Sequence, residues 1–257
     1  PNVITYSATI SACAKCGQWQ KALVLFDELH QRGLKPDVIT YSAMISACEK
    51  GGQSQLAFSL FDELRRSGLR PNAFTYSALI SACEKGGHYD RAFDLFDEVL
   101  RSVTPTIVTY NTMISVCASA RRRDEALQLF SDLQRRGLEP DVYTYGALIA
   151  ACDAQWTTAL ALFDDLRRRG LSPDVVTYGA LLSACGKAGQ WQVAWQLLDD
   201  MTQRGLEPNL VIFNAMISAA ARRLNDDKAS ALFAELQRRG LQPNLITYSA
   251  MISACDK

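Results

Sequence analysis

The sequence predicts an all-α fold, a solenoid of antiparallel helix pairs. Three observations predict it: the chain repeats itself about every 35 residues, each repeat carries two helical apolar patterns, and glycine or proline follows each pattern. A fixed period of this size marks one supersecondary unit stacked on copies of itself. Stacked units share a continuous hydrophobic strip in place of a single globular core, so we expect the 257 residues to form one repeat array.

The prolines mark the period. All eight fall at steps of 35, 35, 34, 35, 33, 35 and 35 residues, beginning at Pro1 and ending at Pro243. If each repeat begins two residues after its proline, the chain holds seven full repeats and a partial one. These are predicted at 3–37, 38–72, 73–106, 107–141, 142–174, 175–209, 210–244 and 245–257.

Each repeat is predicted to hold two helices, as the second repeat illustrates. Tyr41, Ile45 and Cys48 lie at i, i+4 and i+7, the spacing of one apolar helical face. A glycine pair at 51–52 ends this helix, because glycine readily leaves the right-handed helical conformation. An apolar pattern resumes at 56–64, and a glycine and a proline close it. The repeat is therefore read as a helical hairpin.

Three repeats depart from this pattern. The third has 34 residues and lacks the glycine before Pro105. The fourth has three arginines, 121–123, where other repeats have glycine, and the fifth has 33 residues with a shortened turn at 153–156. We expect local irregularity in the superhelical pitch at the third and fifth repeats.

Charge is balanced, with 27 Lys and Arg against 27 Asp and Glu, which argues against a bulk electrostatic nucleic-acid binder. On the second helices an acid precedes an arginine by four residues, the order that helical ion pairs prefer. The pairs are Asp62–Arg66, Asp132–Arg136, Asp165–Arg169 and Glu235–Arg239. We interpret these arginine-rich helix ends as a solvated outer face.

Seven of the eight cysteines fall at one repeat position, where alanine replaces cysteine once. They are Cys13, Cys48, Cys83, Cys117, Cys152, Cys185 and Cys255, with Ala220 in the remaining repeat. Exchange with alanine indicates a small buried packing residue. Copies a whole repeat apart are poor disulfide partners, so a reducing compartment is favoured.

Residues for catalysis or metal binding are scarce. His30 and His88 lie at unrelated repeat positions, and the single CxxC at 13–16 has no second pair. We therefore predict no enzyme activity, no metal and no cofactor. No apolar run approaches the roughly 18 residues of a membrane span, so we expect no membrane partner. Because Pro1 stands where a complete chain has methionine, we expect an excerpt from a longer array.

The repeat resembles the pentatricopeptide repeat of organellar RNA-binding proteins. The likeness rests on Val-Thr-Tyr-Asn-Thr-Met-Ile at 108–114, Ala-Leu-x-Leu-Phe-x-x-Leu at 126–133 and Arg-Gly-Leu-x-Pro-Asp at 136–141, and it covers the whole chain. The resemblance implies a right-handed superhelix whose first helices line the concave surface. It also implies that each repeat reads one base of single-stranded RNA.

In the resembled family, the second residue of a repeat stacks on bases. This position is apolar throughout: Ile4, Ile39, Phe74, Val108, Tyr143, Val176, Val211 and Ile246. From the residues alone, a hydrophobic staple at the helix start explains the column equally well. The resemblance favours the stacking role.

The family assigns base choice to the fifth and closing residues. Position 5 holds Ser7, Ser42, Ser77, Asn111, Gly146, Gly179, Asn214 and Ser249. The closing position holds Asp37, Asn72, Thr106, Asp141, Asp174, Asn209 and Asn244. Helix capping explains the chemistry of both columns, but not why Asn, Ser and Gly interchange at position 5. Short polar side chains also suit a Watson–Crick edge, and we expect Asn111 to line an open groove.

By resemblance, four repeats carry a readable pair. Ser7 with Asp37 implies G, Ser42 with Asn72 implies A, Asn111 with Asp141 implies U, and Asn214 with Asn244 implies C over U. The pairs Ser77 with Thr106, Gly146 with Asp174, and Gly179 with Asn209 depart from the family's pattern. The implied preference, from 5′ to 3′ along the chain, is G-A-N-U-N-N-C.

Position 13 is basic in six repeats: Lys15, Lys50, Lys85, Lys187, Arg222 and Lys257. A cation at a helix C-terminus is also what the helix dipole favours. A column of cations at one phase of a solenoid nevertheless makes a stripe that can follow a phosphate backbone. Ser119 and Ala154 interrupt the stripe, which predicts a weaker backbone grip in the fourth and fifth repeats.

The expected function is sequence-selective binding of single-stranded RNA in organellar RNA processing, stability, editing or translation, in a mitochondrion or plastid. Two alternatives stay open: a helical scaffold for protein–protein interaction, and the guide portion of an RNA nuclease or editing factor whose catalytic domain lies elsewhere. Other RNA-processing proteins are further expected partners. The array ends lack polar caps, so weak self-association is also expected.

Overall fold

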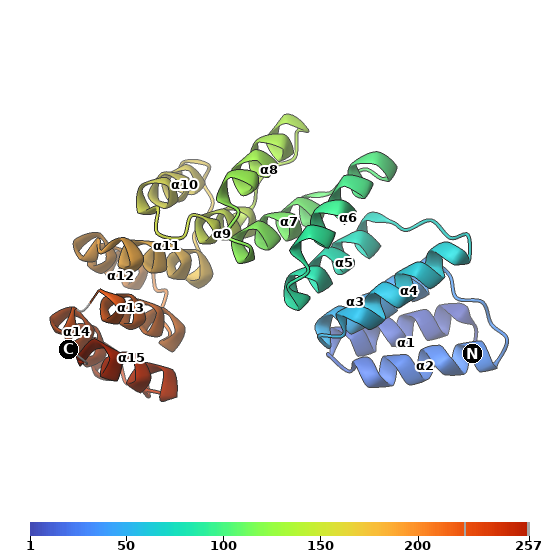
Figure 1. The fold of residues 1–257 in the computed structure, drawn as a ribbon, viewed down its shortest axis with the longest axis horizontal. Helices are drawn as coiled ribbons and strands as arrows, with labels where there is room; N and C mark the ends of the chain where they lie inside the picture. The colour runs from blue at the N-terminus through green and yellow to red at the C-terminus, as the bar shows by residue number, and fades with distance from the viewer. Residues whose placement is uncertain (224, 256–257) are drawn as a thin grey trace. The chain divides into compact units, whose positions relative to one another are not determined.

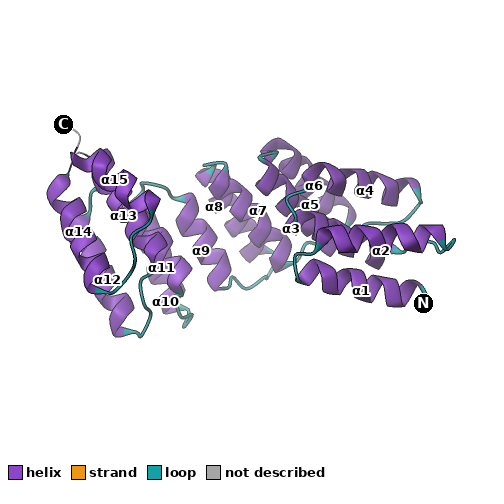
Figure 2. Cartoon of the chain, turned by 90° about the horizontal axis from the view of Figure 1, so that it is seen from below, coloured by secondary structure: helices purple, strands orange, loops and turns teal. Residues whose placement is uncertain are grey.

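The computed structural model describes residues 1–223 and 225–255, and within them every regular element is an α-helix (Figure 2). The first helices of the repeats are α1 (Val3–Lys15), α3 (Val38–Lys50), α5 (Ala73–Gly86), α7 (Ile107–Ser119), α9 (Val142–Ala151), α11 (Val175–Ala188), α13 (Leu210–Arg222) and α15 (Leu245–Cys255). The second helices are α2 (Trp19–Gln31), α4 (Ser54–Arg66), α6 (Tyr89–Ser102), α8 (Arg123–Arg135), α10 (Trp156–Arg168), α12 (Trp191–Gln203) and α14 (Asp226–Arg238). Each first helix starts at the first residue of a repeat as the sequence divides it.

The chain forms two compact units. One comprises Pro1–Ala120 and Gln128–Glu139, and the other Arg121–Leu127 and Pro140–Lys257, so the division passes through α8. Within the first unit α1, α3, α5 and α7 lie side by side in one layer, and α1, α3 and α5 are each paired with an antiparallel second helix (Figure 1). Within the second unit α9, α11, α13 and α15 pack one against the next, and α9, α11 and α13 are each paired with a second helix. The predicted all-α solenoid of antiparallel helix pairs is confirmed.

The closing residue of each repeat caps the next first helix. Asp37 Oδ1 accepts the backbone N–H of Thr40 at 2.8 Å, and Asn72 Oδ1 accepts that of Thr75 at 2.9 Å. Such a bond satisfies one of the unpaired N–H groups at a helix start. The same cap recurs at α1, α7, α9, α11, α13 and α15. Capping therefore accounts for why the first helices begin where they do.

A left-handed glycine ends most second helices. Gly68, at φ 73°, follows α4 and lets the N–H of Leu69 bond the carbonyl of Leu64 over 3.3 Å. This closure satisfies a carbonyl that would otherwise lack a partner at the helix end. Pro71 then prevents the helix from continuing.

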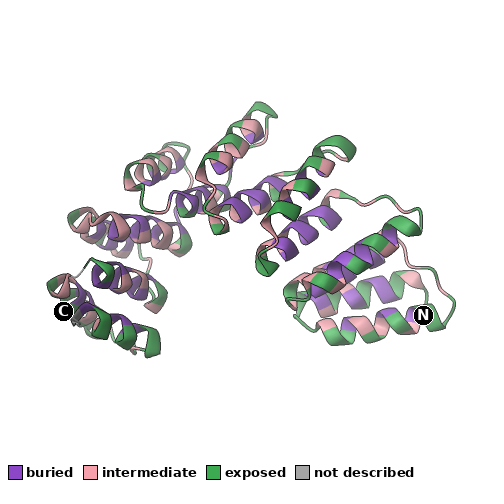
Figure 3. Ribbon diagram, in the orientation of Figure 1, coloured by how far each residue is buried: buried purple, intermediate pink, exposed green. Residues whose placement is uncertain are grey.

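Aromatic contacts join each repeat to the next. Phe61 of α4 meets Tyr76 of α5 edge to face, with ring centroids 5.7 Å apart. The Tyr76 hydroxyl then donates to Glu98 of its own repeat at 2.8 Å. The same ring pairing recurs at Phe26–Tyr41, Phe96–Tyr110 and Phe163–Tyr178. These aromatic side chains are buried. Figure 3 shows buried residues on both the first and the second helices.

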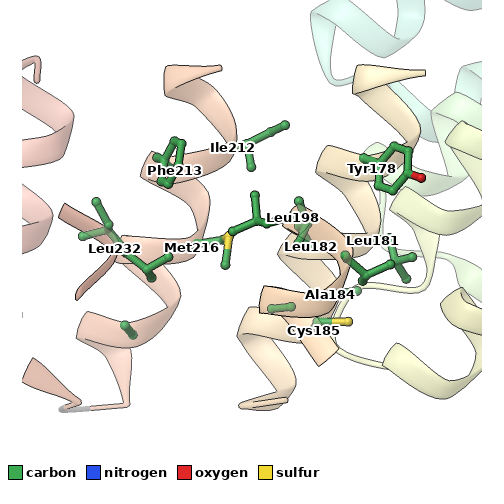
Figure 4. Close-up of a cluster of buried hydrophobic side chains, with 14 of the residues drawn as sticks. Tyr178, Leu181, Leu182, Ala184, Cys185, Leu198, Ile212, Phe213, Met216 and Leu232 are labelled. Carbon is green, nitrogen blue, oxygen red and sulfur yellow. The ribbon is translucent and has the colours of Figure 1, made fainter. Parts of the chain in front are cut away.

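In the second unit, Figure 4 displays the shared hydrophobic strip. Tyr178, Leu181 and Leu182 of α11, Leu198 of α12, and Phe213 and Met216 of α13 belong to this one buried cluster. Cys185 lies fully buried in this strip. The cysteines at the same position of other repeats are also buried: Cys48, Cys83, Cys117 and Cys152. The predicted packing role of the cysteine column is confirmed at these positions. The half-buried Cys13 lies in the first repeat, and the Cys255 side chain lies outside the described part of the chain.

Local departures occur where the sequence is irregular. Helix α9 has 10 residues, whereas the first helices of the other full repeats have 13 or 14. Helix α6 has 14 residues and is followed by the extended Val103. Arg121 and Asp153 adopt the left-handed conformation, with φ of 58° and 49°, at turns where other repeats use glycine. A non-glycine residue pays a steric cost there.

The outer arginines behave largely as expected. Arg136 reaches the Asp132 carboxylate at 2.9 Å, Arg169 reaches Asp165 at 3.0 Å, and Arg239 reaches Glu235 at 2.7 Å. The prediction for Asp62 is wrong, because Arg66 donates instead to the backbone carbonyl of Asp62 at 3.3 Å. None of the helices in the described ranges is long and apolar enough to cross a bilayer.

Candidate nucleic-acid interface

The position-2 side chains are exposed. All eight apolar residues of this column, from Ile4 to Ile246, are between 57% and 75% exposed. A hydrophobic staple would bury them against the first turn of the helix, so packing does not explain why the column is apolar. Each residue lies at the second position of a first helix, and the first helices of each unit form one layer. Each unit therefore presents a row of regularly spaced apolar side chains.

Five of the position-5 side chains are buried: Ser7, Ser42, Ser77, Asn111 and Asn214. Ser42 is 3% exposed, and its Oγ lies 2.6 Å from Oγ1 of Thr75 in the next repeat. Thr75 Oγ1 in turn donates to Oδ1 of the closing residue Asn72 at 3.0 Å. The same chain links Ser7, Thr40 and Asp37, and Ser77, Thr109 and Thr106. The threonine at position 3 thus bridges the two positions that resemblance assigns to base choice.

In the second unit the bridge closes into a triangle. Thr247 Oγ1 donates to Asn214 Oδ1 at 2.6 Å, and Asn214 Nδ2 donates to Asn244 Oδ1 at 3.2 Å. Asn244 Oδ1 also accepts the backbone N–H of Thr247 at 3.0 Å. Each amide therefore keeps a fixed orientation, with the Nδ2 group of Asn244 outside these bonds.

Two repeats carry glycine at position 5. A Cβ at Gly146 would lie 3.5 Å from Oγ1 of Thr177, in ordinary contact. A Cβ at Gly179 would lie 3.3 Å from Cγ1 of Ile212, which replaces the bridging threonine in the seventh repeat. The sixth repeat therefore lacks both the position-5 side chain and the hydroxyl that would orient one.

One cavity gathers all three predicted columns in the first unit. Its volume is about 420 Å³, within the range of small-ligand sites. Its walls are Ser11, Ala14, Lys15, Ile39, Ser42, Ala43, Ser46, Lys50, Asn72 and Phe74. Ile39 and Phe74 are successive position-2 residues, Ser42 and Asn72 are one position-5 and closing pair, and the two lysines occupy position 13. An apolar pair, a polar pair and two cations thus border one space.

A related cavity in the second unit has a volume of about 590 Å³. It is lined by Ser218, Ala221, Arg222, Leu245, Ile246, Ser249, Ala250 and Ser253. Arg222, Ile246 and Ser249 belong to the three predicted columns. Ser249 is exposed here, whereas the position-5 serines of the first three repeats are buried.

The position-13 cations differ in their surroundings. Lys85 Nζ lies 2.6 Å from Glu49 Oε1, and Lys187 Nζ lies 2.7 Å from Asp153 Oδ1. Within the described residues Lys15, Lys50 and Arg222 make no such ion pair. Lys257 lies outside the described residues.

The expectation that Asn111 lines an open groove is wrong, since this side chain is only 6% exposed. Its closing partner Asp141 belongs to the other compact unit. Asp141 itself caps α9, and Asp174 and Asn209 cap α11 and α13.

The sequence reasoning missed the bridging threonines and the serines at position 9. The threonines recur at position 3 in every repeat but the seventh, so the column was visible in the sequence. They are Thr5, Thr40, Thr75, Thr109, Thr144, Thr177 and Thr247. The serines Ser11, Ser46, Ser218 and Ser253 line the two cavities and are equally regular.

Helical hairpins stacked at a 35-residue period, with apolar, polar and basic columns on their first helices, define an all-α repeat protein of the helical-hairpin class. Family models match along the chain: the PPR repeat family at 1–50 and 105–154, the pentatricopeptide repeat domain at 59–120, 161–223 and 196–257, and the PPR repeat at 39–69. The chain belongs to the pentatricopeptide repeat family. No curated protein sequence matches it.

Solved structures agree with this assignment. The pentatricopeptide repeat protein PPR10 from maize is 27% identical, with a TM-score of 0.56 over 99% of this chain and 42% of that chain. PPR10 in complex with an 18-nt psaJ RNA element is 26% identical, with a TM-score of 0.53 over 98% of this chain and 46% of that chain. The chain thus spans less than half the length of the PPR10 chains that it matches.

The nuclear proteinaceous RNase P 2 from A. thaliana is 17% identical, with a TM-score of 0.52 over 65% of this chain and 39% of that chain. At this identity the likeness concerns the fold alone.

Proposed function

We propose that this chain binds single-stranded RNA sequence-selectively, with one base read by each repeat that carries a readable pair. The observation that carries the proposal is the cavity bordered by Ile39, Phe74, Ser42, Asn72 and the position-13 lysines. The complex of the related PPR10 with an RNA element supports RNA as the ligand.

The exposed position-2 side chains suit base stacking. Ile39 and Phe74 stand on the same side of successive first helices and border the same cavity. A base inserted between them would bury two apolar surfaces that the folded chain leaves in water. Stacking on an aromatic ring is worth about 1–3 kcal/mol per base and tolerates any base. This column would supply affinity, and the neighbouring polar pair would supply selectivity.

The side chain of the closing residue can distinguish bases by whether their Watson–Crick ring nitrogen donates or accepts a hydrogen bond. A carboxylate only accepts hydrogen bonds, so Asp37 fits G or U, whose Watson–Crick ring nitrogen carries a proton. An amide also donates, so Asn72 and Asn244 fit A or C, whose ring nitrogen is an acceptor. The cap uses Oδ1 of these side chains and leaves the second polar atom for a base.

The proposed preference is G-A-N-U-N-N-C from 5′ to 3′, with free choice where position 5 is glycine or the pair is Ser77 with Thr106. Selection of bound oligonucleotides from a random RNA pool tests it directly. The expected outcome is an enriched heptamer with G, A, U and C at the first, second, fourth and seventh bases. Recovery of no RNA above background would contradict RNA binding and favour the protein scaffold. Enrichment without positional preference would contradict base reading alone.

We further propose that this binding serves RNA processing, stability, editing or translation in a mitochondrion or plastid, with other RNA-processing proteins as partners. The basis is the family to which the chain belongs. The binding columns form a recognition surface, and we place no catalytic step on the described residues.

A further inference from the structure

In three pairs of adjacent repeats, the side chain at position 12 contacts the position-13 residue of the repeat that follows. Glu49 is an example from the first unit. Its Oε1 lies 2.6 Å from Lys85 Nζ and accepts a hydrogen bond of 2.9 Å from the hydroxyl of Ser81. Lys85 Nζ also donates to the Glu49 carbonyl at 3.3 Å. The Glu49 side chain is 12% exposed and that of Lys85 is 48% exposed, so the carboxylate end of this ion pair is shielded from water while the ammonium end is partly solvated.

The second unit contains the same relationship. Asp153, at position 12 of the fifth repeat, accepts from Lys187 Nζ of the sixth repeat at 2.7 Å. This hydrogen bond lowers the pKa of the Asp153 carboxyl, which therefore stays ionised beside the lysine. An acid at position 12 thus holds the following cation in both units.

Among the described residues, Lys50 and Arg222 follow a position 12 that is not acidic, so neither has a carboxylate at that position to pair with. Ala14 precedes Lys50 in this relationship, and Gly186 precedes Arg222. Lys50 and Arg222 both line cavities that hold the stacking and base-reading columns.

One repeat provides a natural control. Glu84 occupies position 12 of the third repeat, but the following position 13 is Ser119. Glu84 Oε1 accepts from the hydroxyls of Ser115 and Ser119, each at 2.8 Å. The Glu84 carboxylate thus occupies position 12 where the next repeat has no cation at position 13.

We propose that position 12 sets whether the next repeat's position-13 cation is available to an RNA phosphate. Lys50 and Arg222 then hold the phosphate backbone, whereas Glu49 and Asp153 withhold Lys85 and Lys187. This inference rests on the proposed RNA binding and refines it. The contact of each position-13 cation with the phosphate backbone is set separately, by the presence or absence of an acidic residue at position 12 of the preceding repeat. A cation already paired with a carboxylate gains less from a phosphate and releases fewer counterions.

The test compares Glu49→Gln with Glu84→Gln in binding the RNA heptamer 5′-GAAUAAC-3′, measured by fluorescence anisotropy across a range of NaCl concentrations. Both changes remove one negative charge from position 12 and keep an acceptor for the neighbouring serines. Only Glu49→Gln frees a lysine. The expected result is a plot of log K against log salt that is steeper by about 0.7 for Glu49→Gln, equal to about fivefold tighter binding at about 0.1 M salt. Glu84→Gln should leave the slope unchanged.

Lys85→Ala supplies the second arm. It should leave wild-type affinity nearly unchanged and should abolish the gain in the Glu49→Gln background. Equal slopes for the two glutamine variants would overturn the proposal, as would a loss of affinity on Lys85→Ala that is as large in the wild type as in Glu49→Gln. A wild-type chain that binds neither the heptamer nor a random RNA pool would instead overturn RNA binding itself, and the position-12 proposal with it.

Discussion

Asn214 donates its side-chain amide to Oδ1 of Asn244 across 3.2 Å, which joins position 5 of the seventh repeat to its closing position. Thr247 of the following repeat locks the arrangement, since its hydroxyl donates to Asn214 Oδ1. The two residues that we propose to read one base are therefore joined in a single hydrogen-bonded group. A change at either one should alter the group that the base meets.

Replacing Asn244 with aspartate should change the seventh base preference from C to U. The amide can donate to the acceptor nitrogen of C, whereas a carboxylate can only accept from the N–H of U. Anisotropy titrations with heptamers that differ only at the seventh base measure the change. Asn209→Asp is the control, because its repeat has Gly179 at position 5 and should stay permissive. An unchanged preference for C in the Asn244→Asp variant would contradict the assignment.

Thr247→Val should weaken discrimination at the seventh base while total affinity falls less. Valine keeps the shape of threonine but removes the hydroxyl that fixes the Asn214 amide, so the amide gains other orientations. Thr247→Ser, which keeps the hydroxyl, should behave like the wild type. The readout is the ratio of affinities for heptamers that end in C or A. If the Thr247→Val variant keeps the wild-type ratio of affinities, Thr247 contributes to packing and not to base discrimination.

Phe74→Ala should weaken RNA binding by about 1–3 kcal/mol, as expected for one lost stacking surface, with little change in stability because Phe74 is 57% exposed. Tyr76→Ala, two residues away on α5, should do the reverse. Tyr76 is buried against Phe61, so its truncation should lower the free energy of unfolding by about 2–5 kcal/mol. Urea unfolding and RNA titration of both variants separate the two roles.

Stability should fall in acid because of the tyrosine–aspartate bonds. Hydrogen bonding from Tyr110 lowers the pKa of the Asp132 carboxyl, so its contribution is present above the unfolded value of about 3.9 and is lost as the pH falls through the lower folded pKa. Tyr110→Phe removes this bond and should cost about 1–2 kcal/mol at neutral pH. The loss should shrink when unfolding is measured near pH 2. A loss independent of pH would contradict the linkage.

The cysteines should differ sharply in reactivity. Burial raises the pKa of Cys48 to about 12 and that of Cys83, Cys152 and Cys185 to about 11. The thiolate is the reactive form, so these thiols should resist iodoacetamide until the chain unfolds, whereas the exposed Cys16 should react first. Mass spectrometry of peptides after timed labelling measures the order. Early labelling of Cys48 would contradict its packing role.

The sequence was sufficient to locate the first helices, because two residues mark where each one starts: a proline and a capping side chain. A proline stops the preceding helix, and two residues later a side chain such as Asp37 caps the next one. The cysteine column was also predictable, since its exchange with Ala220 excluded a chemical role. Both inferences use residues within one repeat.

Contacts between repeats were less accessible to sequence reasoning. The burial of Asn111 and of the position-5 serines depends on the offset between neighbouring helices, which a column of residue types does not encode. The neutralisation of Lys85 by Glu49 depends on the same offset. The position-13 cations therefore looked alike in the sequence, whereas in the structure the described ones fall into a group paired with a carboxylate and a group without such a pair.

The threonine bridge changes where the natural module of this chain begins and ends. A segment cut at the prolines separates Ser42 and Asn72 from the Thr75 that holds them together. A segment cut at the tyrosines, from Tyr41 to Thr75, carries all three. Chimeric arrays that exchange repeats should therefore be joined inside the first helix, just before position 5. Each transferred segment then contains its position-5 residue, its closing residue and the threonine whose hydroxyl bonds to both.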